Sequence, residues 1–128
     1  MNPAKDPLYK DVDPKNLPLS ECLKDTLARV RPYYAAHIHN RLLDGQNILV
    51  VAHGNTTRSL LLLTQCVSES DITGTEIPCS IPVHIEFRVF REPSGSKSLE
   101  MIRYEFIADP EVIAKEQEKV RNQGKAAK

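Results

Sequence analysis

An apolar run that ends in histidine and glycine constrains the fold of this 128-residue chain more than any other feature. Residues 48–52 are apolar at every position, so both faces of a strand formed there would need cover. Such runs are typical of parallel strands with helices on both sides. The chain then reads His53-Gly54-Asn55 and continues into a segment with helical spacing at residues 56–66. The sequence therefore predicts an α/β fold with a strand–turn–helix unit at its centre.

The segment before this unit predicts a long helix. Apolar residues recur at helical spacing over residues 23–42. Ser20 is placed to cap its N-terminus, and the Glu21 carboxylate there favours the helix dipole. Pro32 is expected to kink or split the helix, because proline cannot donate a backbone hydrogen bond. Gly45 is expected to end it.

Two alternating segments further along predict an antiparallel hairpin. Residues 83–90 and 99–106 have the two-residue period of strands, and turn-forming residues separate them. A charged helix is expected over residues 110–121. The predicted organisation is an extended lead-in, an α/β body and a helical and mobile tail, at residues 1–18, 19–108 and 109–128.

Composition argues against several classes of function. The 17 Lys and Arg residues balance the 17 Asp and Glu residues, which argues against a general nucleic-acid or membrane-surface role. The three cysteines are widely spaced, so neither a disulfide framework nor a zinc site is predicted. No apolar run reaches the roughly 20 residues of a membrane span, and residues 1–18 lack the apolar core of a signal peptide. We therefore expect a cytoplasmic location with reduced thiols.

The residues after the apolar run form a candidate anion site. His53 is expected at the C-terminal end of a strand, where α/β sheets form their sites. Gly54 allows a sharp turn, and Asn55 is a favoured N-cap of a helix whose first amides attract phosphate or carboxylate. A histidine beside such an anion can stay protonated. Two questions stay open: whether His53 serves a site or only bonds a loop, and whether Arg58 reaches the anion or only forms a salt bridge.

Motifs spread over nearly the whole chain carry a family resemblance. The chain reads AHGN at residues 52–55, SECLKDTLARVRPYY at 20–34, IPCSIPVHIEF at 77–87 and NQGKAAK at 122–128. These motifs resemble, in this order, those of the phosphoglycerate mutases that depend on 2,3-bisphosphoglycerate. The resemblance implies a histidine-phosphatase α/β fold with helices on a mostly parallel sheet. It also implies phosphoryl transfer between the 2- and 3-hydroxyls of glycerate in glycolysis, a phosphohistidine intermediate, 2,3-bisphosphoglycerate as phosphoryl donor, and no metal.

The resemblance also suggests roles for four residues. His53 matches the family's second active-site histidine, which hydrogen-bonds the phosphoryl group in flight. Gly54 and Asn55 match residues that contact substrate, and Arg58 is retained as a substrate-binding candidate. The family's nucleophilic histidine lies in an Arg-His-Gly motif, which is absent from this chain. We therefore expect the C-terminal half of one mutase domain, with an incomplete core, inactive alone, and associated with itself or with a mutase subunit.

Two other functions remain open from the sequence. One is a phosphatase of the same superfamily, in which water accepts the phosphoryl group. The other is a non-catalytic remnant that binds a phosphorylated metabolite or a mutase subunit. Cys79 and Ser80 replace the family's usual Thr-Gly pair, which can alter a loop near the pocket. Weaker site candidates are the other histidines, two strand carboxylates and two tail lysines: His37, His39, His84, Glu86, Glu105, Lys125 and Lys128.

Overall fold

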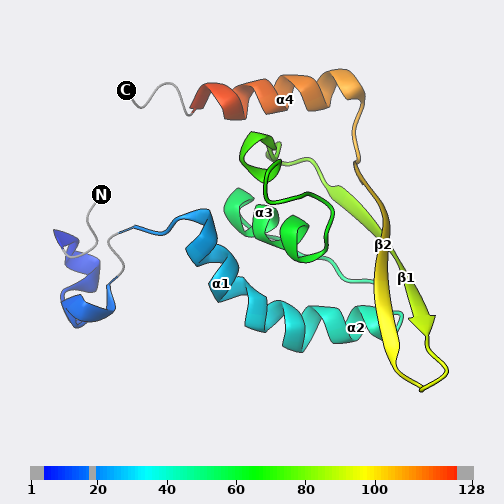
Figure 1. Cartoon of the computed structure of the whole chain (residues 1–128). Coiled ribbons are helices and arrows are strands. Elements are labelled where there is room, and N and C mark those ends of the chain that lie inside the picture. Colours follow the sequence, from blue (N-terminus) through cyan, green and yellow to red (C-terminus); the bar gives the residue numbers. More distant parts are fainter. Residues whose placement is uncertain (1–4, 18–19, 124–128) are drawn as a thin grey trace.

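The computed structural model of the chain describes residues 5–17 and 20–123, and its elements are arranged as in Figure 1. The helices are α1 (Leu23–Tyr33), the π-helical segment η4 (Tyr34–His39), α2 (Asn40–Leu43), α3 (Gly54–Leu63) and α4 (Pro110–Gln123), and the strands are β1 (Val83–Arg91) and β2 (Lys97–Phe106). The lead-in contains short 3-10 turns rather than purely extended chain. The tail predicted to be mobile, residues 122–128, is helical at residues 122 and 123, which belong to α4. The rest of it, residues 124–128 with Lys125 and Lys128, lies outside the described residues. The fold is of mixed α/β type.

The long helix forms as predicted, with different details at its start and middle. Its N-cap is Cys22 and not Ser20, and the Cys22 backbone N–H donates to the Asp25 carboxylate at 3.0 Å. Pro32 does not split the helix. After Tyr33 the chain continues directly into the π-helical segment η4. The predicted end at Gly45 is confirmed: Gly45 has a φ of 77°, the left-handed conformation that glycine adopts readily.

The predicted hairpin is also confirmed. β1 and β2 pair antiparallel, with Val83 opposite Phe106 and Val89 opposite Leu99. The register shifts once between Glu86 and Phe87, where the ladder is irregular. Figure 1 shows α2 reaching the hairpin near its turn, and the two elements are in contact.

The predicted parallel strand at residues 48–52 is wrong for this structure. Within the described residues the only sheet is the two-stranded hairpin, and residues 48–52 take part in no backbone hydrogen bond. Leu49 is 88% exposed and Val51 is 92% exposed. A strand needs a neighbouring strand to satisfy its N–H and C=O groups. The described chain offers no such neighbour, because β1 and β2 already pair with each other.

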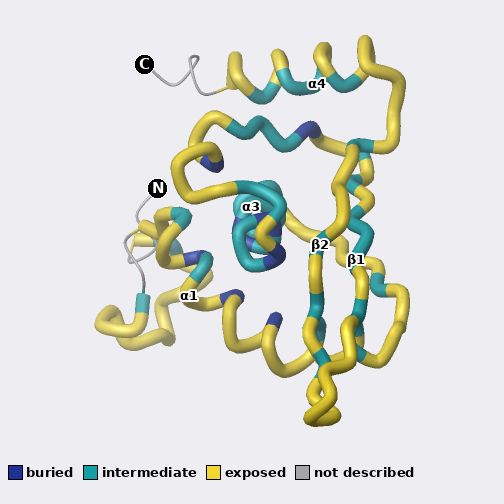
Figure 2. Tube along the Cα trace, turned by 45° about the vertical axis from the view of Figure 1, so that its right-hand side comes forward, coloured by how far each residue is buried: buried dark blue, intermediate teal, exposed yellow. Residues whose placement is uncertain are grey.

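The core is small for the size of the chain. The large buried apolar side chains of the described residues are Val30, Tyr34, Leu61 and Ile72, and Pro78 is buried as well. Figure 2 shows buried positions mainly where α1 and α3 face each other, and these two helices pack together. The chain exposes 9810 Å², whereas a compact monomer of 14.4 kDa exposes about 6,800 Å². The expectation of an incomplete core is therefore met by the structure. No helix among the described residues is long and apolar enough to cross a membrane.

Candidate functional site

His53 lies at the junction between the exposed apolar segment and α3. It is the N-cap of α3: its backbone is extended, and its carbonyl accepts the first helical hydrogen bond from the Thr57 N–H at 3.0 Å. The predicted N-cap, Asn55, is instead the second residue of the helix. The imidazole takes the capping role because its Nδ1 accepts a hydrogen bond from the Asn55 backbone N–H at 3.3 Å.

This hydrogen bond decides which nitrogen of His53 carries the proton. Since Nδ1 accepts, its lone pair is engaged, and the neutral ring holds its proton on Nε2. A doubly protonated ring would turn Nδ1 into a donor and lose the cap. The His53 side chain is exposed, and no hydrogen bond to Nε2 occurs within the described residues. The neutral ring of His53 thus presents an Nε2–H donor rather than a nucleophilic lone pair.

The first turn of α3 supplies further donors for an anion. The backbone N–H groups of Gly54 and Thr56 have no backbone partner in the part of the chain that the structure describes. They lie at the positive end of the helix dipole, where phosphate and carboxylate groups are stabilised. A Cβ added to Gly54 would meet no atom within 4 Å. The space beside this turn is therefore accessible from outside.

Arg58 joins the first turn of α3 to a distant loop. Its Nη1 donates to the Asn55 side-chain carbonyl oxygen Oδ1 at 3.1 Å, and its Nε donates to the Thr75 backbone carbonyl at 3.1 Å. The residue is partly buried, and within the described residues it forms no salt bridge. The structure thus brings three of the predicted residues, His53, Asn55 and Arg58, into one hydrogen-bonded group.

The loop that holds Arg58 is also tied to the tail helix α4. The Glu76 carboxylate pairs with the Arg121 guanidinium at 2.9 and 3.3 Å, and the Glu76 carbonyl accepts a hydrogen bond from Gln117 Nε2 at 3.2 Å. The hydrogen bonds from Arg121 lower the pKa of Glu76 from its ordinary value of 4.5. The sequence did not predict this contact, because 45 residues separate its partners and no local pattern joins them.

The loop of residues 77–82 keeps a glycine-like backbone without glycine. Ser80 has a φ of 62°, in the left-handed region that glycine favours. A non-glycine residue such as Ser80 adopts this region at a cost of about 1 kcal/mol.

The weaker candidates are engaged elsewhere. His37 lies near Tyr33 and His39 near Tyr34, in tilted ring pairs with centroids 4.7 and 5.8 Å apart. His84 lies 3.8 Å from Glu105, and Glu86 pairs with Arg103 at 2.8 Å. No group of three or more potential metal ligands occurs among residues 5–17 and 20–123.

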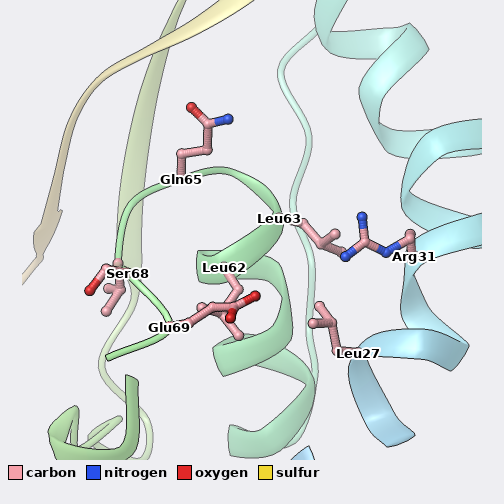
Figure 3. A pocket seen from close by; sticks show the side chains of 8 residues that line it. Leu27, Arg31, Leu62, Leu63, Gln65, Ser68 and Glu69 are labelled. Carbon is pink, nitrogen blue, oxygen red and sulfur yellow. The ribbon is translucent and has the colours of Figure 1, made fainter. Parts of the chain in front are cut away.

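A cavity of about 460 Å³ opens between α1 and the end of α3, away from this group (Figure 3). Four of its eight lining residues are aliphatic and four are polar or charged: Leu27, Leu62, Leu63 and Val67, and Arg31, Gln65, Ser68 and Glu69. It borders neither a histidine nor a cysteine. It therefore lacks the groups on which the phosphate chemistry would depend.

Comparison with known proteins relates the chain to one enzyme family. No model of a known protein family matches it. The 2,3-bisphosphoglycerate-dependent phosphoglycerate mutases of two Borreliella burgdorferi strains and of Borreliella afzelii are each 39% identical to it over 124 residues. The match covers 97% of this chain and 47% of each relative. The chain is homologous to these enzymes and spans about half the length of the curated relatives it matches.

Proposed function

We propose that this chain is the C-terminal part of one phosphoglycerate mutase domain, with a lead-in at residues 1–18, a body at 19–108 and a tail at 109–128. The complete enzyme would interconvert 2- and 3-phosphoglycerate in glycolysis, in the cytoplasm, through a phosphohistidine. The homology over 97% of the chain supports this proposal. The observation that carries it is the His53 cap, which leaves Nε2–H as a donor for a phosphoryl oxygen.

In the proposed mechanism this chain stabilises the moving phosphoryl group and does not accept it. A nucleophilic histidine must offer a lone pair at the attacking nitrogen, whereas the His53 cap places the proton of the neutral ring on Nε2. His53 would donate this proton in a hydrogen bond as charge builds on the phosphoryl oxygens. Gly54, through its backbone N–H, and Asn55, whose side chain Arg58 contacts, would bind the substrate's anionic groups. When bound, 2,3-bisphosphoglycerate would supply the phosphoryl group, and the proposed chemistry requires no metal.

The donor role of His53 can be separated from its capping role by substitution. His53→Asn keeps an oxygen that can cap α3, so the free energy of unfolding should change by no more than about 0.5 kcal/mol. The shorter side chain lacks Nε2–H, so 3-phosphoglycerate should bind at least tenfold more weakly in an NMR titration of the 128-residue chain. Equal affinity in wild type and variant would contradict the donor role.

Activity provides the second test of the proposal. The 128-residue chain should not turn over 3-phosphoglycerate, and mass spectrometry after incubation with 2,3-bisphosphoglycerate should find no phosphoryl adduct. A stoichiometric adduct on His53 with mutase turnover would show that His53 is the nucleophile. Release of inorganic phosphate alone would instead favour the phosphatase function.

The exposed apolar segment supports association with a second copy or with a mutase subunit. Residues 48–52 carry no charge, and their backbone groups are unpaired on both edges in the described structure. Bare strand edges of this kind recruit other strands. Sedimentation velocity should find that the wild-type chain associates, and that Leu49→Lys with Val51→Lys shifts it toward monomer. A compact wild-type monomer with a cooperative melt at high temperature would contradict this expectation.

A further inference from the structure

The hydrogen bond between Arg58 and Asn55 settles the orientation of the asparagine amide. A guanidinium has only donors, so the atom facing Arg58 Nη1 at 3.1 Å must be the carbonyl oxygen Oδ1. The amide NH₂ group then points away from the guanidinium. No hydrogen bond from this NH₂ group occurs among the described residues. Asn55 therefore presents a donor on the side that Arg58 does not occupy.

We propose that Arg58 is a positioning residue, which holds Asn55 so that its NH₂ group donates to the anionic ligand beside His53. This inference rests on the proposed phosphoglycerate site and gives Arg58 a defined part in it. The ligand's phosphate or carboxylate oxygens accept hydrogen bonds and cannot donate them. An Asn55 amide turned the other way would aim a carbonyl oxygen at that anion, and the contact would become repulsive.

Arginine suits this task because one planar group makes both anchoring contacts. Nε is fixed by the Thr75 carbonyl and Nη1 by Asn55, so the guanidinium plane spans from the loop to the helix. Lysine carries the same charge but lacks this rigid fork. Arg58 is partly buried, and within the described residues it has no carboxylate partner. Its orientation therefore depends on these two contacts.

One test reads the orientation of Asn55 without any ligand. In ¹⁵N–¹H NMR spectra of the 128-residue chain, the Asn55 side-chain signals are assigned by their loss in Asn55→Asp. In wild type these signals should differ from those of exposed asparagines, and in Arg58→Met they should move to the exposed position while the α3 backbone signals remain. Wild-type signals already at the exposed position, or unchanged in Arg58→Met, would overturn the inference.

A double-mutant cycle then tests whether Arg58 acts through Asn55. Arg58→Met should weaken 3-phosphoglycerate binding at least fivefold, but no more than twofold when Asn55 is already alanine. Additive effects would show that Arg58 touches the ligand itself and would overturn the positioning role. Arg41→Met removes the same charge from an exposed arginine and should leave binding unchanged.

Two further variants keep the inference testable if Arg58→Met does not fold. Arg58→Lys should bind at least threefold more weakly than wild type, and full affinity would show that charge alone suffices. Asn55→Asp keeps a partner for Arg58 but turns a carboxylate oxygen toward the ligand, so it should fold and lose at least tenfold in affinity. If wild type itself does not bind 3-phosphoglycerate, the proposed function fails, and the Asn55 amide signals alone decide whether Arg58 holds the side chain.

Discussion

Residues 48–52 and helix α3 (Gly54–Leu63) are neighbouring apolar segments on either side of His53, yet they differ completely in environment. In α3, Leu61 is fully buried, whereas Leu49 is 88% exposed. The helix satisfies its backbone hydrogen bonds internally and needs only one packing partner, which α1 provides. The strand-like segment needs neighbours for its backbone as well as for its side chains. A chain can therefore keep its helices while a strand-like segment beside them stays unpaired.

The hairpin sharpens this contrast because it is also built from strand sequence. β1 and β2 pair over residues 83–91 and 97–106, with one register shift between Glu86 and Phe87. A short turn, in which Gly95 has a φ of 88°, joins the two strands and places them side by side. The difference between the hairpin and residues 48–52 thus lies in the distance along the chain to a partner strand and not in strand propensity.

The largest expected effect is on the free energy of unfolding. It is measured by truncating one buried leucine and, for comparison, one exposed leucine. Leu61→Ala should lower the free energy of unfolding by about 2–5 kcal/mol, because it leaves a cavity in the small core. At concentrations low enough to keep the chain monomeric, Leu49→Ala should change it by no more than about 0.5 kcal/mol. Urea titrations followed by circular dichroism measure both values. A similar loss for both would mean that Leu49 is covered in solution, which is the result expected for a paired assembly.

Thiol reactivity gives a second contrast between packed and open regions. Cys22 and Cys79 are exposed, whereas Cys66 is partly buried, with its Sγ 3.2 Å from Thr64 Oγ1. Burial raises the pKa of the Cys66 thiol, so less thiolate is present to react. Ellman's reagent should label two thiols quickly and the third in a separate, slower phase. Cys66→Ser should remove only the slow phase, and three equal rates would refute the packing around α3.

The ends of two helices allow a smaller stability test. α2 is followed by Gly45 and α3 by Gln65, which have φ values of 77° and 60°. Both positions close the helix with the same pair of backbone hydrogen bonds to the last turn. Gln65→Gly should therefore raise the free energy of unfolding by about 1 kcal/mol, and Gly45→Gln should lower it by a similar amount. A loss of stability in Gln65→Gly would show that the glutamine side chain at the rim of the cavity makes a favourable contact.

The smallest expected effect concerns the ion pair between the body and the tail helix. Because Arg121 lowers the pKa of Glu76 below 4.5, the pair stabilises the fold above that pH. Its contribution is lost as the pH falls through the lowered pKa and Glu76 becomes protonated. The melting temperature of Arg121→Gln should therefore lie slightly below that of wild type at pH 6, and the two should converge in acid. An equal difference at pH 6 and pH 3 would show that Arg121 acts through packing.

Much of the local structure was predicted correctly from the sequence. The long helix, its end at Gly45, the hairpin and the tail helix were each signalled by residues close together in the chain. The candidate site was partly predicted: His53, Gly54 and Asn55 do lie at the start of a helix. The N-caps were misplaced, at Ser20 and at Asn55, because caps depend on which side chain reaches an amide and several residues nearby could do so.

The sequence by itself determined the features whose partners lie within a few residues, because their hydrogen bonds close over short stretches of chain. These features are the helices, the turns and the strand pair joined by Gly95. Only the tertiary structure decided that residues 48–52 remain unpaired, and that Arg58 bonds the Thr75 carbonyl. It also decided that Glu76 holds the tail helix through Arg121. The last contacts join residues 17 and 45 positions apart, so they depend on how the elements pack and on which partner strands are present, which no local pattern encodes.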